Sequence, residues 1–147
     1  MSRLVPIMAA SLALAACGQS EPSPPVAAMA QVRLAAVPGR PAAGYLSLVV
    51  GGDRGALVSV SSPQAGRVEM HETMAHGNVS SMRPVARIPV RGGEMISFTP
   101  GGRHLMLYDL APAVGAGGRM DLILHFERGG DEALVAEVVA PGGDIGE

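Results

Sequence analysis

The stretch "RMDLILHFER" (119–128) decides the fold class, because its apolar and polar side chains alternate. Every second position from 120 to 126 is apolar, and these side chains would share one face of an extended chain. They are Met120, Leu122, Leu124 and Phe126. A period of two is typical of a strand with one face on a core and the other in solvent. We therefore expect a half-buried β-strand here.

Segments of similar character occur on both sides of this stretch. They are 32–37, 44–50, 56–62, 66–72, 94–100, 103–110 and 132–140. Glycine-rich turn signals separate many of them, as at 51–53, 101–102 and 129–131. Short strands separated by turns about every 8 to 12 residues are typical of antiparallel β-sandwiches and barrels. The chain has 147 residues and is 48% hydrophobic, which suits one all-β domain with a single core.

The charge distribution argues against nucleic acid as a partner. The formal net charge is −2, and the 11 basic residues are all arginines that lie scattered along the chain. Binding to the phosphate backbone usually needs a basic patch or stripe. We expect no nucleic-acid partner.

The N-terminal stretch "MSRLVPIMAASLALAAC" (1–17) has the organisation of a processing signal. One charge at Arg3 precedes an apolar stretch that ends at Leu14, and small residues lead to Cys17. The apolar part is too short to span a bilayer comfortably. The segment 14–17 resembles the lipobox of bacterial lipoproteins, which implies cleavage before Cys17 and lipid attachment to that residue. The alternative is an ordinary signal peptide in which the cysteine has no role.

This resemblance gives a provisional division of the chain. We expect a lipoprotein signal peptide at 1–16, a lipidated tether at 17–30 that is rich in Pro and Ser, and a β-domain at 31–147. The protein would then be a periplasmic, membrane-anchored lipoprotein of a Gram-negative bacterium, in contact with the membrane through its lipid anchor only. Gly18, rather than Asp, after the lipidated cysteine favours the outer membrane.

Cys17 is the only cysteine, so the domain itself has no thiol. Disulfides, thiolate metal sites and cysteine catalysis are therefore excluded for it. No Ser-His-Asp arrangement is recognisable from its sequence context, and we do not expect an enzyme.

Histidines and methionines supply the remaining candidates for chemistry. After Cys17 the chain has four His and seven Met: His71, His76, His104, His125, Met29, Met70, Met74, Met82, Met95, Met106 and Met120. Any one of these methionines is more simply explained as a filler of the core. However, His104 and Met106 alternate within "RHLMLYD" (103–109), so a strand would project both side chains from one face.

His71, Met82, His104 and Met106 follow the spacing H-x10-M-x21-H-x-M. This pattern resembles the copper-binding signature of the periplasmic copper chaperone family, the PCuAC-type proteins. The surrounding sequence resembles that family as well, in "AGRVEMHETM" (65–74), "PGGRHLML" (100–107) and "LILHFERGGDE" (122–132).

The resemblance implies a cupredoxin-like antiparallel β-sandwich in which these four side chains bind Cu(I). It further implies a metallochaperone that delivers copper to respiratory oxidase assembly, at the CuA centre. Its partner would be a copper-accepting periplasmic protein or an oxidase subunit. The chain ends "APGGDIGE", without further His or Met, so we expect one Cu(I) per chain, and we expect a monomer.

The donor chemistry is consistent with that expectation. Two imidazoles and two thioethers form a neutral, soft set, and thioether sulfur selects Cu(I). Zinc sites usually contain thiolates, or a set of histidines and carboxylates with a bound water. We therefore expect monovalent copper rather than zinc.

The neighbouring residues receive simpler interpretations. A regular strand would place Met74 and His76 on the face opposite His71, so we do not expect them to be ligands, although the sequence leaves a supporting role open. Met70, Met95 and Met120 are interpreted as core residues, and His125 as solvated. Glu72 is a candidate to orient a ligating imidazole.

Two other functions remain open from the sequence. The domain could sequester copper as a buffer or resistance protein instead of delivering it. It could also be a structural β-sandwich lipoprotein that binds no metal.

Overall fold

The computed structural model describes residues 27–146, which form ten β-strands. The strands are β1 (Ala27–Arg33), β2 (Ala42–Val49), β3 (Gly55–Ser61), β4 (Ala65–His76), β5 (Val79–Pro84), β6 (Ile88–Val90), β7 (Met95–Phe98), β8 (Arg103–Leu110), β9 (Arg119–Phe126) and β10 (Asp131–Val139). Within this part of the chain no helix is long and apolar enough to cross a bilayer. The signal peptide, Cys17 and most of the expected tether lie outside the described residues.

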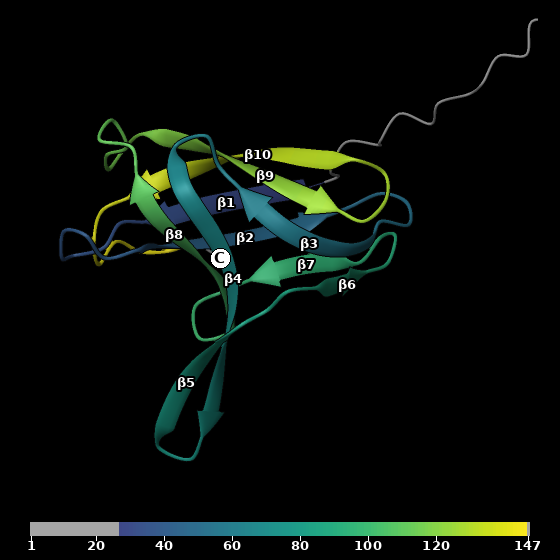
Figure 1. Cartoon of the computed structure of the whole chain (residues 1–147), viewed down its shortest axis with the longest axis horizontal. Helices are drawn as coiled ribbons and strands as arrows, with labels where there is room; N and C mark the ends of the chain where they lie inside the picture. Colours follow the sequence, from purple (N-terminus) through teal and green to yellow (C-terminus); the bar gives the residue numbers. More distant parts are fainter. Residues whose placement is uncertain (1–26, 147) are drawn as a thin grey trace, which may run out of the picture.

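The strands form one continuous sheet that curls around a core (Figure 1). The order is β5-β4-β8-β2-β1-β10-β9-β3-β6, and β7 pairs with the part of β2 that β8 leaves free. The all-β expectation is confirmed, with one departure from an antiparallel arrangement. β1 and β10 run parallel, while the other recorded pairs are antiparallel.

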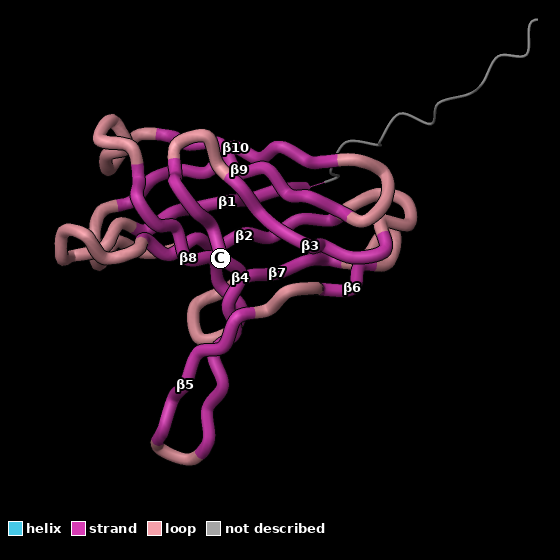
Figure 2. Tube along the Cα trace, viewed as in Figure 1, coloured by secondary structure: helices cyan, strands magenta, loops and turns pink. Residues whose placement is uncertain are grey.

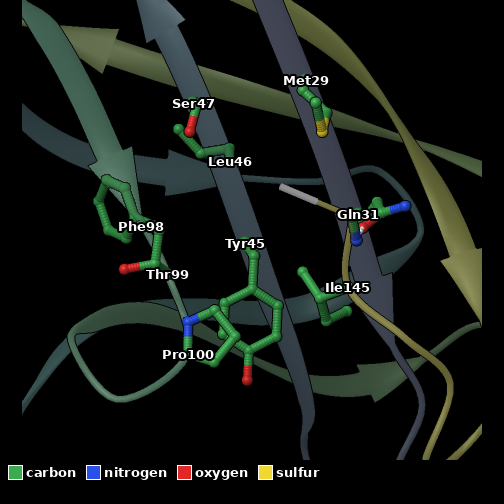
Figure 3. A pocket seen from close by; sticks show the side chains of 10 residues that line it. Met29, Gln31, Tyr45, Leu46, Ser47, Phe98, Thr99, Pro100 and Ile145 are labelled. Atoms are coloured by element: carbon green, nitrogen blue, oxygen red, sulfur yellow. Dashed lines mark hydrogen bonds between the residues drawn. The ribbon is translucent and has the colours of Figure 1, made fainter.

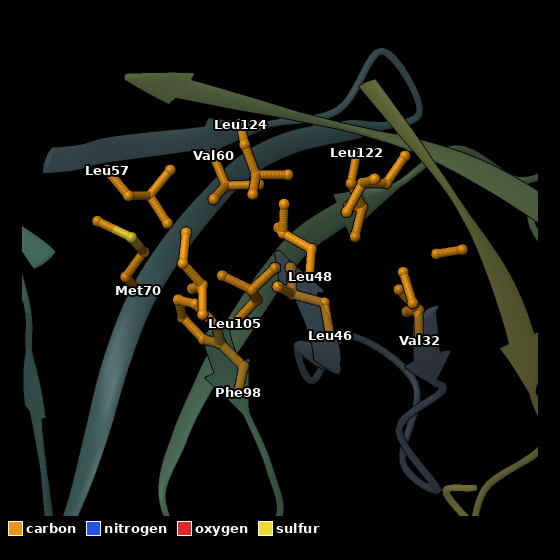
Figure 4. Packing of buried hydrophobic residues seen from close by; sticks show 14 of the residues in the cluster. Val32, Leu46, Leu48, Leu57, Val60, Met70, Phe98, Leu105, Leu122 and Leu124 are labelled. Carbon is orange, nitrogen blue, oxygen red and sulfur yellow. The ribbon is translucent and has the colours of Figure 1, made fainter. Parts of the chain in front are cut away.

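The inner face of the curled sheet carries the hydrophobic core (Figure 4). The alternation in 119–128 has the expected outcome, because the four apolar side chains of β9 are buried and point inward. They pack with apolar side chains of β2, β3, β4, β7 and β8, including Leu48, Leu57, Met70, Phe98 and Leu105. Burial of each such side chain contributes on the order of 1.5–3 kcal/mol.

β10 repeats the same alternation, with one charged exception among its inward-facing residues. Glu132 occupies such a position and is 8% exposed, whereas its partner Arg54 is 2% exposed. The Arg54 guanidinium forms an ion pair with Glu132 and donates to the carbonyls of Gly129 and Gly51. This buried pair connects the segment before β3 to the turn between β9 and β10.

The hairpin of β4 and β5 extends away from the rest of the sheet (Figure 2). Its pairing runs from His71 opposite Pro84 to His76 opposite Val79, and the turn is closed by Gly77, whose φ is +62°. An L-residue with a side chain rarely adopts this conformation, so glycine suits the turn. Every residue of β5 is exposed.

The sequence placed several element boundaries wrongly. β1 begins at Ala27 instead of residue 32, so β-structure extends into the segment expected to be the tether. β5 and β6 were not expected, and most of the residues between His71 and Met82 belong to a hairpin. An exposed two-stranded hairpin needs no apolar alternation, which explains why the pattern did not reveal it.

Candidate metal centre

The pairing of β4 with β8 brings two of the predicted ligands directly together. His71 lies opposite His104 in the register, and their ring centroids are 6.0 Å apart at an interplanar angle of 37°. The sequence separation of these residues is large, so only the fold creates their proximity. The pair lies at the base of the projecting hairpin.

The register also places both methionines on the same face of the sheet as the two histidines. Met106 lies opposite Glu69, one alternation along from the His71–His104 pair, and Met82 lies opposite Thr73 on the other side. Directly opposed residues in antiparallel strands share a face, and diagonal neighbours are about 7–8 Å apart, within reach of long side chains. His71 is thus the direct neighbour of His104 and a diagonal neighbour of both methionines.

These four side chains differ in their exposure to solvent. His104 is 7% exposed and Met106 is half-buried, whereas Met82, on β5, is 59% exposed. The structure therefore brings His71, His104 and Met106 together on the body of the sheet. Met82 lies on the same face but on the projecting hairpin.

The hydrogen bonds of the two imidazoles leave different nitrogens free. His104 Nδ1 lies 3.2 Å from the carbonyl oxygen of Gly102, and His71 Nε2 lies 3.0 Å from the Glu69 carboxylate. Carbonyl and ionised carboxylate oxygens can only accept, so each of these ring nitrogens donates its proton. The lone pairs then reside on His104 Nε2 and His71 Nδ1.

His71 Nδ1 is buried and has no hydrogen-bond partner. An unsatisfied buried polar atom costs about 1–3 kcal/mol, and a bound cation would satisfy this nitrogen. The donor set on this face therefore suits a soft metal ion.

Glu69 forms the centre of a polar cluster beside His71. Tyr108 Oη donates to its carboxylate at 3.3 Å, and Arg67 Nε lies 3.2 Å from it. The hydrogen bond from His71, followed by the charge of Arg67 and the bond from Tyr108, holds the pKa of the Glu69 carboxyl below its usual range. Glu72, the candidate named from the sequence for orienting an imidazole, lies on the opposite face of β4 and pairs with Arg83.

The methionines and histidines that were not expected to be ligands have mixed outcomes. Met70 and Met120 are buried as expected, but Met95 is 63% exposed and is not a core residue. Met74 and His76 lie on the face of the hairpin opposite His71, as the alternation indicated. The second of these two side chains is exposed.

A Ser-His-Asp chain that the sequence did not reveal lies on the outer surface. His125 Nε2 is 2.7 Å from Ser61 Oγ, and His125 Nδ1 is 3.0 Å from Asp131 Oδ2. These residues come from β3, β9 and β10, and only the pairing of these strands brings them together. The side chains of His125 and Asp131 are 32% and 54% exposed. His125 is thus hydrogen-bonded on both sides instead of simply solvated.

A pocket of about 520 Å³ lies elsewhere on the molecule (Figure 3). β1, β2, β7 and the C-terminal segment line it, with Met29, Tyr45, Phe98 and Ile145 among its walls. None of the four predicted metal ligands belongs to this lining. Within residues 27–146 no three His, Cys, Asp or Glu side chains gather as a cation site.

The fold defined by this sheet is that of the PCuAC domains. The copper-bound PCuAC domain from PmoF2 superposes with a TM-score of 0.61 at 23% identity, covering 78% of this chain and 92% of that domain. The Cu(I) form of DR1885 from Deinococcus radiodurans gives a TM-score of 0.59 at 24% identity, covering 83% of both chains. At these identities the likeness concerns the fold.

A family model described as "Putative lipoprotein LpqE-like" matches residues 26–138. The chain belongs to this LpqE-like family. A relative from Rickettsia prowazekii, the uncharacterized protein RP573, is 33% identical over 72 residues. That match covers 48% of this chain and 40% of the relative, so it spans less than half of either protein.

Proposed function

We propose that this protein binds one Cu(I) ion per chain and passes it to a copper-accepting protein. The observation that carries the proposal is the placement of His71 opposite His104, with Met106 and Met82 on the same face. The structurally similar PmoF2 domain is a copper-bound form and the DR1885 structure is a Cu(I) form, which supports it.

The chemistry of the four donors explains the choice of ion. Thioethers and imidazoles are uncharged and soft, so they favour Cu(I) over hard divalent ions. Thioethers also cannot form disulfides, and a site built with them stays usable in an oxidising compartment, although oxidation to the sulfoxide would disable it.

The cellular setting is part of the same proposal. Cleavage before Cys17 and lipidation of that residue would anchor the domain on the periplasmic side of a membrane, and Gly18 favours the outer membrane. The acceptor would be a periplasmic protein or an oxidase subunit at the CuA centre, and the role would be delivery without catalysis. The lipoprotein description of the family supports the anchor.

Anaerobic Cu(I) titration with native mass spectrometry tests the binding step. A form lacking residues 1–17 serves, because all ten described strands and their core follow residue 26. We expect one copper per chain, with weaker binding in His71→Ala, His104→Ala, Met82→Ala and Met106→Ala. Met74→Ala is the matched control, since this methionine lies on the other face of the hairpin. No copper uptake, or equal loss in the control, would refute the proposal.

Transfer kinetics separate delivery from storage. A chaperone should load an apo acceptor faster than free Cu(I) dissociates, because the ion passes through a shared intermediate. A buffer protein would transfer no faster than dissociation permits. A structural lipoprotein would show no change in cellular copper content when His104 is replaced.

A further inference from the structure

We propose that Glu69 is a positioning residue that makes His71 bind copper through Nδ1, while His104 binds through Nε2. This inference rests on the proposed Cu(I)-binding function of the same face. It assigns a ligand atom to each histidine and a supporting role to the carboxylate that accepts a hydrogen bond from His71.

The first observation is that the two imidazoles are held in opposite tautomers. His71 donates from Nε2 to Glu69, and His104 donates from Nδ1 to the carbonyl of Gly102. A neutral imidazole has only one N–H, so the free lone pair of each ring is on the other nitrogen. In His71 this is the buried Nδ1 that has no partner.

The second observation is that Glu69 is itself held in place from two sides. Tyr108 Oη donates to the same carboxylate oxygen that receives the His71 bond, and Arg67 contacts the other oxygen. The Arg67 guanidinium also lies 4.1 Å from the centroid of the Tyr108 ring. These contacts fix the carboxylate on the strand position directly opposite Met106.

The geometry gives Glu69 two effects on the ligand. It holds the ring of His71 in one orientation. Its negative charge, next to Nε2–H, also increases the electron density of the ring and makes Nδ1 a stronger ligand for the metal. Loss of such an outer partner typically reduces metal affinity roughly 10- to 100-fold. The backbone carbonyl of Gly102 performs the equivalent function for His104, but no side-chain substitution can remove it.

Long-range ¹H–¹⁵N NMR on the metal-free protein lacking residues 1–17 tests the assignment directly. At pH near 7.5 we expect the Nε2–H tautomer for His71 and the Nδ1–H tautomer for His104. Because Cu(I) is diamagnetic, loading should then shift His71 Nδ1 and His104 Nε2. A protonated Nδ1 on His71, or a copper-induced shift confined to its Nε2, overturns the proposal.

Competition with a Cu(I) chelator tests the role of the carboxylate. We expect Glu69→Ala to weaken binding roughly 10- to 100-fold and to mix the His71 tautomers. Glu69→Gln, whose amide oxygen can still accept from Nε2–H, should restore the tautomer and part of the affinity. Glu72→Ala is the matched control, since Glu72 is on the same strand but faces away and pairs with Arg83.

The results distinguish this inference from the proposed function. A wild-type protein that takes up no Cu(I) would refute the function, and the NMR measurement on the metal-free protein would still report the tautomers. Wild-type binding that Glu69→Ala leaves unchanged, or a Glu69→Gln variant as weak as Glu69→Ala, would refute only the positioning role.

Discussion

Replacement of Glu132 by alanine should strongly destabilise the domain, because it leaves a buried charge without its partner. Arg54 is 2% exposed and Glu132 is 8% exposed. The guanidinium would keep its bonds to the carbonyls of Gly129, at 2.6 Å, and Gly51, at 3.2 Å, and its position 5.4 Å from the Phe126 ring centroid. It would lose the only carboxylate that contacts it among the described residues.

The magnitude follows from the environment of the remaining charge. Removal of one partner from a buried ion pair costs about 3–5 kcal/mol. We expect the lower end of this range, about 3 kcal/mol, because two backbone carbonyls still accept from the guanidinium. Such a loss is a large part of the roughly 5–15 kcal/mol that stabilises a typical domain.

Urea and thermal unfolding, followed by circular dichroism, measure the effect. A destabilisation of this size corresponds to a fall in Tm of roughly 10 °C for a domain of this length. The control is Glu127→Ala, which breaks an exposed pair with Arg87 and should cost far less, because solvent screens exposed ion pairs. An Arg54→Met/Glu132→Leu double variant should recover most of the loss. Equal effects of Glu132→Ala and the control would refute this reasoning.

Three further predictions concern the metal site and the response to pH. Met106→Ala should lower Cu(I) affinity in chelator competition while Met95→Ala, at an exposed position of β7, should not; equal losses would contradict the proposed site. Copper affinity should fall on acidification, because a protonated imidazole has no lone pair left for the metal. Affinity that stays constant from pH 5 to 7.5 would exclude His71 and His104 as ligands. The hydrogen-bonded ion pair with Arg87 lowers the pKa of Glu127 in the folded protein. The small stabilisation from this pair is therefore complete above the pKa that the carboxyl has in the unfolded chain, and it is lost as the pH falls through the lower pKa of the folded state. Urea midpoints that Glu127→Gln leaves unchanged at both pH 7 and pH 3 would contradict this.

The fold was predictable from local patterns where a strand of seven or more residues alternates clearly between apolar and polar side chains, as β9 does. The alternation in β9 located its start at Arg119 and its inward side chains correctly, although the strand ends at Phe126, two residues earlier than expected. Two kinds of feature left no such pattern. β5 has no buried face, and Glu132 occupies an apolar position only because Arg54, distant in the sequence, lies beside it. The parallel pairing of β1 with β10 also depends on how the sheet closes.

The sequence predicted the shared face of the four candidate ligands better than it predicted the groups that surround them. The spacing of the four soft donors predicts a ligand set, and the register places all four side chains on one face, while their binding of a metal stays a prediction. The sequence offered Glu72 as a candidate to orient an imidazole, whereas the carboxylate that contacts His71 is that of Glu69. Both are acidic residues close to His71 in the sequence, and the alternation of β4 decides between them: residues two apart share a face, and adjacent residues do not. That rule could have identified Glu69 in advance.

A Cu(I) ion bound as proposed would be held unequally by the body of the sheet and by the projecting hairpin. Three of the donors belong to strands rooted in the packed interior, while Met82 is attached to an arm surrounded by water. Bending of that arm could detach one sulfur without disturbing the interior, and would open a vacant coordination position towards solvent. An acceptor that approaches the exposed hairpin would meet Met82 first. The bond from Met82 to the metal would then be the first to break, and the bonds from the three other donors would follow.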